Sequence, residues 1–219
     1  MEDMNIRETR SIALNVFEQF TPDLPDHYRE TEYVLLGNIA PALQIHVLEQ
    51  MKRPKFVIAD TMDLWINTTK EDLKRLLGKI DMLILNDSEA KDLTGEKNLL
   101  KAARAIRAMG PRYIAIKKGE HGCLLFGDDE ADFFTCGAFP LEEVKDPTGA
   151  GDTFAGGFAG HLASINEPDI SFENLRQSVV FGSVMASFNV EDFSLERLRE
   201  IEKEHVHERA SHFRKISIF

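Results

Sequence analysis

Short apolar runs recur along the chain and alternate with longer segments whose apolar residues fall at helical spacing. Four of the runs lie at residues 33–36, 56–59, 82–85 and 113–116. Each run is continuous, as is typical of a parallel strand that is buried on both faces of its sheet. A further apolar stretch at residues 12–17 predicts another strand near the N-terminus.

The segments between these runs predict helices. In the first half of the chain we expect them after residues 37–41, at 69–77, from Ser88 to Gly95, and at 98–109. Thr68 and Glu71 have the spacing of a capping box, and Ser88 is placed to cap the next helix. The first of these helices should present one apolar face, made of Leu43, Val47, Leu48 and Met51. Later helices are expected at 153–164, 174–188 and 195–209.

Strands that alternate with helices indicate a mostly parallel sheet that is covered by helices on both faces. Residues 123–126 and 132–136 predict an antiparallel pair joined by a turn at 127–129. The length of 219 residues and the hydrophobic content of 43% suit a single α/β domain over residues 1–219. Ligands of such sheets bind beyond the carboxyl ends of the strands. The residues that fall at or just past these ends are Asp60, Asn86, Lys117 and Gly119.

Residues 146–158 combine small residues, an acid and a predicted helix start. Gly149, Ala150 and Gly151 come directly before Asp152. Small residues let the backbone approach a ligand closely, and the free N–H groups at a helix start attract anions. Two roles are open to the Asp152 carboxylate. It can stabilise the helix as an ordinary acidic first residue, or it can take a proton from a nucleophile beside a bound phosphate.

Two common nucleotide-binding motifs are excluded. The P-loop pattern Gly-x-x-x-x-Gly-Lys-Ser/Thr occurs nowhere in the chain. Phe154 stands where the third glycine of a dinucleotide fingerprint would fall after Gly149 and Gly151. An anion site at residues 149–152 must therefore belong to another type of protein.

Composition narrows the partners and the compartment. The net charge of −11 argues against nucleic acid and anionic membranes as partners. The apolar runs are far shorter than a membrane span and the chain begins with polar, acidic residues, so we expect neither a membrane helix nor a signal peptide. Cys123 and Cys136 allow at most one disulfide bridge. We expect both to be reduced and buried, which suits a cytoplasmic protein.

The thirteen residues from Asp146 to Phe158 resemble the second signature of the ribokinase/PfkB family of carbohydrate kinases, Asp-x-Thr-Gly-Ala-Gly-Asp. The resemblance extends over residues 5–198 and implies a three-layer α/β/α ribokinase-like fold. It also implies transfer of a phosphoryl group from ATP, with Mg²⁺, to a hydroxyl of a sugar or nucleoside acceptor. Asp152 would then accept the hydroxyl proton, while the N–H groups of Gly149, Ala150 and Gly151 hold the charge of the transferring group.

The resemblance assigns roles to two further stretches. Asn86 and Glu89 match the family's Asn-x-x-Glu motif, which helps to place phosphate and magnesium. A strand end followed by a capped helix would also explain these two residues. The family contacts its nucleotide with a turn that corresponds here to Lys117, Lys118, Gly119 and Gly122. Threonine often occupies the position of Lys117 in the family, and a solvated turn is the alternative.

Asp146, Gly182 and Ser183 also match positions with a family role. Asp146 corresponds to an acid that is often tied to a monovalent-cation site, and a plain loop aspartate before Pro147 is the alternative. Gly182 and Ser183 correspond to the helix that walls the adenine, although close helix packing selects small residues too.

Two other groups of residues have no firm match. Residues 60–63 and Trp65 are expected to border the cleft. His205 and His207, on the last predicted helix, indicate a solvated face rather than a metal pair.

The family's first, glycine-rich signature and its small β-sheet lid are not found in the sequence, so we expect an N-terminally truncated form of the fold. Much of the family's sugar pocket comes from that part. Two functions therefore stay open: an active small-molecule kinase, which the intact Asp152 favours, and a nucleotide-binding remnant without catalysis. Residues 12–17 and 33–36 lack their usual neighbours, which predicts a homo-oligomer formed through this region.

Overall fold

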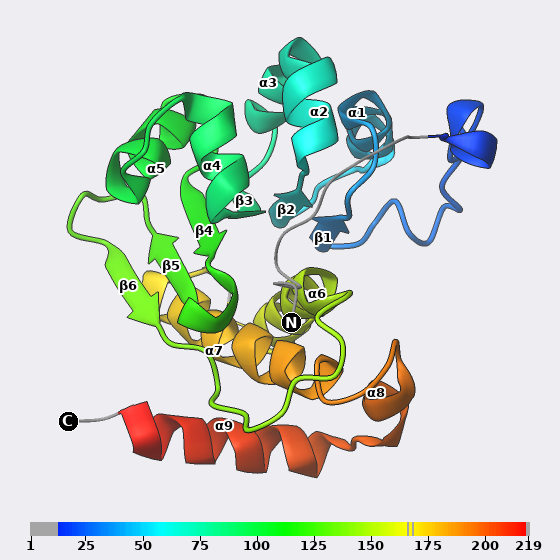
Figure 1. The fold of residues 1–219 in the computed structure, drawn as a ribbon. Helices are drawn as coiled ribbons and strands as arrows, with labels where there is room; N and C mark the ends of the chain where they lie inside the picture. The colour runs from blue at the N-terminus through cyan, green and yellow to red at the C-terminus, as the bar shows by residue number, and fades with distance from the viewer. Residues whose placement is uncertain (1–12, 166, 168, 218–219) are drawn as a thin grey trace.

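The computed structural model describes residues 13–165, 167 and 169–217, and it places six strands in one sheet (Figure 1). The strands follow one another in chain order across the sheet. The first four strands are parallel to one another. The fifth pairs antiparallel with the fourth, and the sixth pairs antiparallel with the fifth, which confirms the predicted antiparallel pair. They are β1 (Tyr33–Leu36), β2 (Phe56–Asp60), β3 (Met82–Asn86), β4 (Tyr113–Lys117), β5 (Cys123–Phe126) and β6 (Phe133–Cys136).

Helices cover both faces of the sheet, which gives the expected three layers (Figure 1). On one face lie α1 (Pro41–Gln50), α2 (Asp63–Thr68), α3 (Lys70–Leu77), α4 (Asp87–Thr94) and α5 (Leu99–Arg107). On the other lie α6 (Ala150–Ser164) and α7 (Phe172–Asn189), with α9 (Lys203–Ser217) packed on α7. Two 3₁₀ helices, η1 (Asn15–Glu18) and η2 (Gly119–His121), and the short helix α8 (Glu196–Glu200) complete the described elements.

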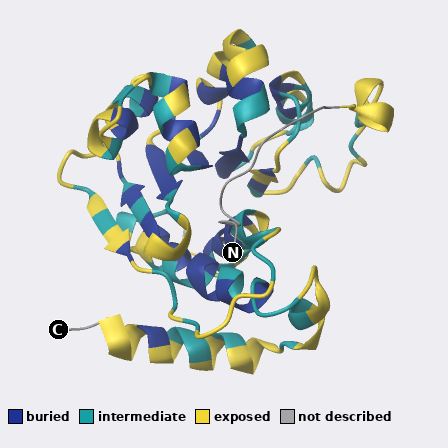
Figure 2. Cartoon of the chain, in the orientation of Figure 1, coloured by how far each residue is buried: buried dark blue, intermediate teal, exposed yellow. Residues whose placement is uncertain are grey.

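The apolar runs of the sheet separate two hydrophobic clusters, because successive side chains of a strand point to opposite faces. Leu83 and Leu85 of β3 pack with Leu73 and Ile106 under the first helix layer. Ile84, between them in sequence, packs with Phe158 of α6 on the other face. All of these side chains are fully buried. In Figure 2 the central strands β2, β3 and β4 are coloured mainly as buried.

The glycines of α6 and α7 bring these two helices into close contact. A Cβ atom on Gly157 would lie 2.7 Å from Cγ of Met185, and one on Gly182 would lie 2.8 Å from the carbonyl oxygen of Phe154. The two helices therefore meet almost backbone to backbone, and this contact holds the start of α6 in a fixed position.

The prediction of a strand at residues 12–17 is wrong over the described residues 13–17. These residues turn into η1, in which Val16 and Phe17 are 80% and 54% exposed. Ile12 lies outside the described residues. An apolar run forms a strand only where a neighbouring strand bonds its backbone. The N–H of Phe17 instead donates to the carbonyl of Leu14 at 2.9 Å.

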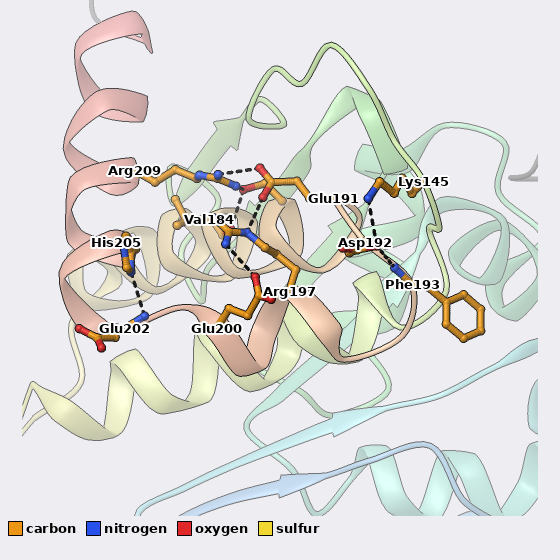
Figure 3. Close-up of polar contacts among 11 residues, drawn as sticks. Lys145, Val184, Glu191, Asp192, Phe193, Arg197, Glu200, Glu202, His205 and Arg209 are labelled. Atoms are coloured by element: carbon orange, nitrogen blue, oxygen red, sulfur yellow. Dashed lines mark hydrogen bonds and ion pairs between the residues drawn. The ribbon is translucent and has the colours of Figure 1, made fainter.

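Two helix predictions also need correction. Thr68 and Glu71 form no capping box, because α2 ends at Thr68, whose hydroxyl donates to the carbonyl of Leu64 at 2.6 Å. The helix expected at 195–209 is split into α8 and α9 by an extended residue, Ile201. At this break His205 Nδ1 accepts a hydrogen bond from the N–H of Glu202, as a side-chain cap would (Figure 3).

The face predicted for α1 is only partly correct. The helix buries Gln44 and Ile45, whereas Val47, Leu48 and Met51 are half-buried against the same cluster. Within the described residues, no helix has the length and apolar character that a membrane crossing requires.

Candidate active site

The polar residues predicted at strand ends lie at one edge of the sheet. Asp60 ends β2, Asn86 ends β3 and Lys117 ends β4, and these three strands are neighbours. Asn86 and Lys117 are direct partners in the strand register. The ammonium of Lys117 reaches across to Asp60, with Nζ 3.5 Å from Oδ2. Both side chains are largely buried, at 17% and 9% exposed, so this pair is set into the molecule rather than on its surface.

The start of α6 faces this edge. Gly149 takes the left-handed conformation with φ of 82° and precedes the first helical residue, Ala150. The helix therefore begins three residues before the predicted start at residue 153. Gly151 and Asp152 thus lie in the first turn, and the Asp152 side chain is exposed. A Cβ atom on Gly151 would lie 3.0 Å from Nζ of Lys117. Glycine at this position therefore leaves room for the ammonium beside the helix start, where the N–H of Ala150 donates to the carbonyl of Pro147 at 3.2 Å.

The charges of this edge act on one another. Burial raises the pKa of the Asp60 carboxyl, while the Lys117 ammonium and the N–H of Thr61 oppose that rise. The negative charge of Asp152 raises the pKa further, which places Asp152 within electrostatic reach of Asp60. The structure therefore brings together the predicted residues Gly151, Asp152 and Lys117, with Asp60 as a fourth member.

Gln44 of α1 supports the same edge, and sequence reasoning did not identify it. Its side chain is 2% exposed, and its Nε2 donates to the carbonyls of Gly37 at 2.9 Å and Asp60 at 3.0 Å. One side-chain amide thus fixes the ends of β1 and β2. The signal in the sequence was a glutamine on an otherwise apolar helix face.

Asn86 and Glu89 form a capping box at the start of α4. Asn86 Oδ1 accepts from the N–H of Glu89 at 2.8 Å, and Glu89 Oε2 accepts from the N–H of Asn86 at 2.7 Å. The prediction that Ser88 caps this helix is wrong, because the Ser88 hydroxyl donates to Asn86 Oδ1 instead. The capped-helix alternative thus accounts for both residues locally. Their proposed roles toward phosphate and magnesium stay predictions.

The predicted nucleotide turn folds as a tight loop between β4 and β5. The N–H of Lys118 donates to the carbonyl of Gly122 at 2.7 Å, with η2 between them. Gly122 has φ of 83°, and a Cβ atom there would lie 2.0 Å from the carbonyl oxygen of Cys136. This turn therefore requires glycine for packing against β6, whatever else it contacts.

Gly182 and Ser183 lie in the middle of α7 and are buried. Gly182 is required by the close approach of Phe154 of α6, and the Ser183 hydroxyl lies 4.0 Å from Sγ of Cys136. Close helix packing accounts for these small residues, and the adenine-wall role stays a prediction.

Asp146 and the segment after α7 border the loop before α6. The N–H of Thr148 donates to Asp146 Oδ1 at 2.9 Å, and hydrogen bonds from Thr148 hold the pKa of the Asp146 carboxyl below its usual value. The amide of Asn189, 2% exposed, donates to the carbonyl of Ser194 at 3.0 Å. Asn189 Oδ1 has no hydrogen-bond partner within the described part of the chain and lies 3.5 Å from the position of a Cβ atom on Gly149.

Trp65 lines a cleft of about 480 Å³ between η1 and α2, and residues 60–63 do not line it, so their expected place beside the ligand cleft stays a prediction. Its indole N–H donates to Asn38 Oδ1 at 2.8 Å. In the described part of the chain, no three His, Cys, Asp or Glu side chains are grouped so that they could hold a metal ion.

Comparison with known proteins places this geometry in a family. The family model for pfkB family carbohydrate kinases matches residues 28–200. A cytidine kinase of Thermococcus kodakarensis is 29% identical over 143 residues, which are 62% of this chain and 49% of that protein. A solved nucleoside kinase of Methanocaldococcus jannaschii superposes with a TM-score of 0.69 at 20% identity, over 91% of this chain and 61% of its own.

A ribokinase of Arabidopsis thaliana, solved with ribose and ATP, superposes with a TM-score of 0.64 at 25% identity, over 81% of this chain and 55% of its own. The chain thus spans about half the length of the curated cytidine kinase that it matches. The matched residues include β1 to β6 and the loop of Gly149 to Asp152. This chain belongs to the pfkB family of carbohydrate kinases.

Proposed function

We propose that the protein transfers a phosphoryl group from ATP to a hydroxyl of a sugar or nucleoside. The observation that carries this proposal is the position of Asp152. An exposed carboxylate stands in the first turn of α6, next to Gly151 and within electrostatic reach of the Asp60–Lys117 pair. A proton acceptor and groups that hold an anion thus lie together beyond the ends of the strands, where such sheets bind ligands.

In this proposal Asp152 accepts the proton of the acceptor hydroxyl as the hydroxyl oxygen attacks the terminal phosphorus of ATP, the bond from that phosphorus to its bridging oxygen breaks, and ADP leaves. The N–H groups of Gly149, Ala150 and Gly151, with the positive end of the α6 dipole, hold the charge that develops on the transferring group. The Lys117 ammonium adds a full positive charge at the same place. Positioning and charge stabilisation account for most of the rate in phosphoryl transfer.

Mg²⁺ suits this site when nucleotide is bound, because it takes one or two protein carboxylates, water and phosphate oxygens rather than an all-protein cage. Glu89 and Asp146 are the carboxylates proposed to help to place cations, Glu89 for magnesium and Asp146 for a monovalent ion. Asn86, Lys118, Gly119, Gly122, Gly182 and Ser183 are proposed to bound the nucleotide. The matched nucleoside kinases and the ribokinase support a small hydroxyl-bearing acceptor.

Replacing Asp152 with asparagine tests this assignment. A general base contributes roughly 10²- to 10⁴-fold, so D152N should lose at least about 100-fold in ATP turnover with cytidine or ribose as acceptor. Its free energy of unfolding should change by less than about 1 kcal/mol, since only a charge at a helix start is lost. Phosphorylated product is measured by mass spectrometry, and stability by thermal melting.

Glu173→Gln is the matched control, because Glu173 is an exposed acid in the first turn of α7. It loses the same kind of helix-start charge and should keep full turnover. Full turnover in D152N would remove Asp152 as the base. Calorimetric binding of ADP and Mg²⁺ by a wild-type chain that phosphorylates no acceptor would favour a nucleotide-binding protein without catalysis.

A further inference from the structure

The Lys117 ammonium lies near the Asp60 carboxylate and near the backbone of Gly151, the residue before Asp152. Asp60 Oδ2 is 3.5 Å from Nζ, and the backbone of Gly151, the residue before Asp152, lies on the other side of the ammonium. Asp60 is buried, whereas Asp152 is exposed. Lys117 ends β4, and the negative charge of Asp152 acts on the Asp60 carboxyl with which this ammonium is paired.

Asp60 is held rigidly while it binds this ammonium. The N–H of Thr61 donates to Asp60 Oδ1 at 2.8 Å, which leaves Oδ2 turned to Lys117. The carbonyl of the same residue accepts from Gln44 Nε2 at 3.0 Å. Backbone and side chain of Asp60 are thus both anchored, and its carboxylate is a fixed point rather than a mobile surface acid.

We propose that Asp60 is a positioning residue that holds the Lys117 ammonium beside Gly151, where it meets the transferring phosphoryl group, and keeps it from pairing with Asp152. This inference rests on the proposed function, in which Asp152 must be free to accept a proton. An ammonium that is bonded to Asp152 would occupy the lone pairs needed for the acceptor hydroxyl and would leave the helix start.

The energetics of Asp60 argue against a merely structural role. Burial raises the pKa of its carboxyl. Such a group binds its proton more tightly in the folded state. Its contribution to stability is therefore complete below the unfolded pKa of about 3.9 and is lost as the pH rises through the raised folded value. Lys117 offsets part of this effect, so Asp60→Asn should leave the melting temperature within about 4 °C of the wild type.

The experiment is a double-mutant cycle on the full chain with D60N and Lys117→Met, assayed with ATP, Mg²⁺ and an acceptor that the wild type phosphorylates. Asp60→Asn should lower kcat/KM by about 30-fold, within the range of coupling between contacting residues. In the Lys117→Met background the same change should have an effect of less than about 2-fold, because Asp60 then has no ammonium to hold.

The pH dependence of kcat gives a readout that a structural role would not move. With Asp60→Asn the ammonium is free to pair with the carboxylate proposed as the base, so the acid limb of the profile should move to lower pH. The further change Lys117→Met should abolish this movement. Asp60→Glu, which restores a carboxylate, should recover part of the activity.

Asp81→Asn is the matched control. Asp81 precedes β3 at the opposite edge of the sheet, where its carboxylate accepts from the N–H of Val57 at 2.8 Å. This variant should leave kcat/KM and the pH profile unchanged even if it lowers stability.

Two results would overturn the inference while the proposed function stands: wild-type activity in Asp60→Asn, or equal losses from this change with and without Lys117. A melting temperature of D60N more than about 4 °C below the wild type, roughly 1 to 2 kcal/mol, would also overturn it by showing that Asp60 acts through the fold. A wild-type chain that neither binds ADP and Mg²⁺ nor phosphorylates any acceptor would reject the proposed function, and this inference with it.

Discussion

The guanidinium of Arg209 lies 2.6 Å from the carboxylate of Glu191 (Figure 3), and it lies 3.4 Å from the ring centroid of Phe188. Arg197 of α8 reaches the same carboxylate at 3.1 Å. These contacts hold α8 and α9 to the end of α7. Asn189, the last residue of α7, has its Oδ1 3.5 Å from the position of a Cβ atom on Gly149. The C-terminal helices therefore support the loop of the candidate active site through the end of α7.

Arg209→Met should destabilise the protein. The change removes a cation–π contact and leaves Glu191, which is 22% exposed, with only one of its two arginines. For a partly buried ion pair we expect a loss of about 2 kcal/mol in the free energy of unfolding. In a chain of this size that loss lowers the melting temperature by roughly 4 to 8 °C.

Arg199→Met is the control for Arg209→Met, because Arg199 is an exposed arginine on α8. It should melt within about 1 °C of the wild type, as surface substitutions do. If both variants melt alike, the Arg209–Glu191 pair does not hold α9 in place.

Gly149→Ala and Gly160→Ala should change stability in opposite directions. Gly149 has φ of 82°, a conformation that costs an alanine about 1 kcal/mol or more. Gly160 lies inside α6, with nothing within 4 Å of an added Cβ atom, so alanine should stabilise it by about 0.5–1 kcal/mol. Urea unfolding of the two variants measures the difference. Equal effects would show that the conformation of Gly149 does not depend on glycine.

Most of the fold could be predicted from the sequence, because β1 to β4 are continuous apolar runs that only a buried sheet accommodates. The loop before α6 was predicted as well, because its glycines and its acid are consecutive in the sequence and form a recognisable local pattern. Residues 12–17 could not be predicted, since their structure depends on which backbone lies beside them.

The pairing of side chains within the candidate site could not be predicted from the sequence either. Asp60 and Lys117 are 57 positions apart and meet only through the order of the strands. Asn86 and Glu89 illustrate the reverse, because one pattern of residues serves a capping box and matches a ligand motif alike. The structure thus removes the limit set by distance in sequence, whereas the second role of the Asn86–Glu89 pattern stays a prediction.

His161 should make stability depend on pH. Its ring stacks on Phe181 with centroids 3.8 Å apart, and its Nε2 is buried without a partner among the described residues. Burial lowers the pKa of His161, and the nearby His207 lowers it further. The unfolded state therefore binds the proton more tightly, so stability falls as the pH drops from about 6.5 toward the lowered folded value.

Urea unfolding at pH 7.5 and pH 5.5 checks this prediction. His161→Gln should lose less stability than the wild type between these two pH values. His121→Gln is the control, because the His121 side chain is 74% exposed in η2 and should leave the pH dependence as it is. An unchanged pH dependence in His161→Gln would remove His161 as its source.

The N-terminal segment presents apolar side chains to solvent. Val16, Phe17, Phe20 and Tyr28 are between 46% and 80% exposed (Figure 2). In the sheet, β1 is the last strand among the described residues and is bonded to β2 on one side. Leu35 in this strand is 36% exposed. Among the described residues, a strand edge and exposed apolar side chains are both features that often mark an interface.

We therefore expect the purified chain to associate through this segment rather than remain a monomer of 24.8 kDa. Replacing Phe17 and Phe20 together with serine should weaken association, because burying an aromatic side chain contributes roughly 1.5–3 kcal/mol. Phe193→Ser is the control, since Phe193 is 67% exposed in the segment between α7 and α8, outside the N-terminal segment, and its loss should leave association unchanged. Light scattering over a hundredfold range of concentration measures the mass. A wild-type chain that stays monomeric throughout would show that β1 and the apolar segment are stable in water as they stand, and the interface would then be rejected.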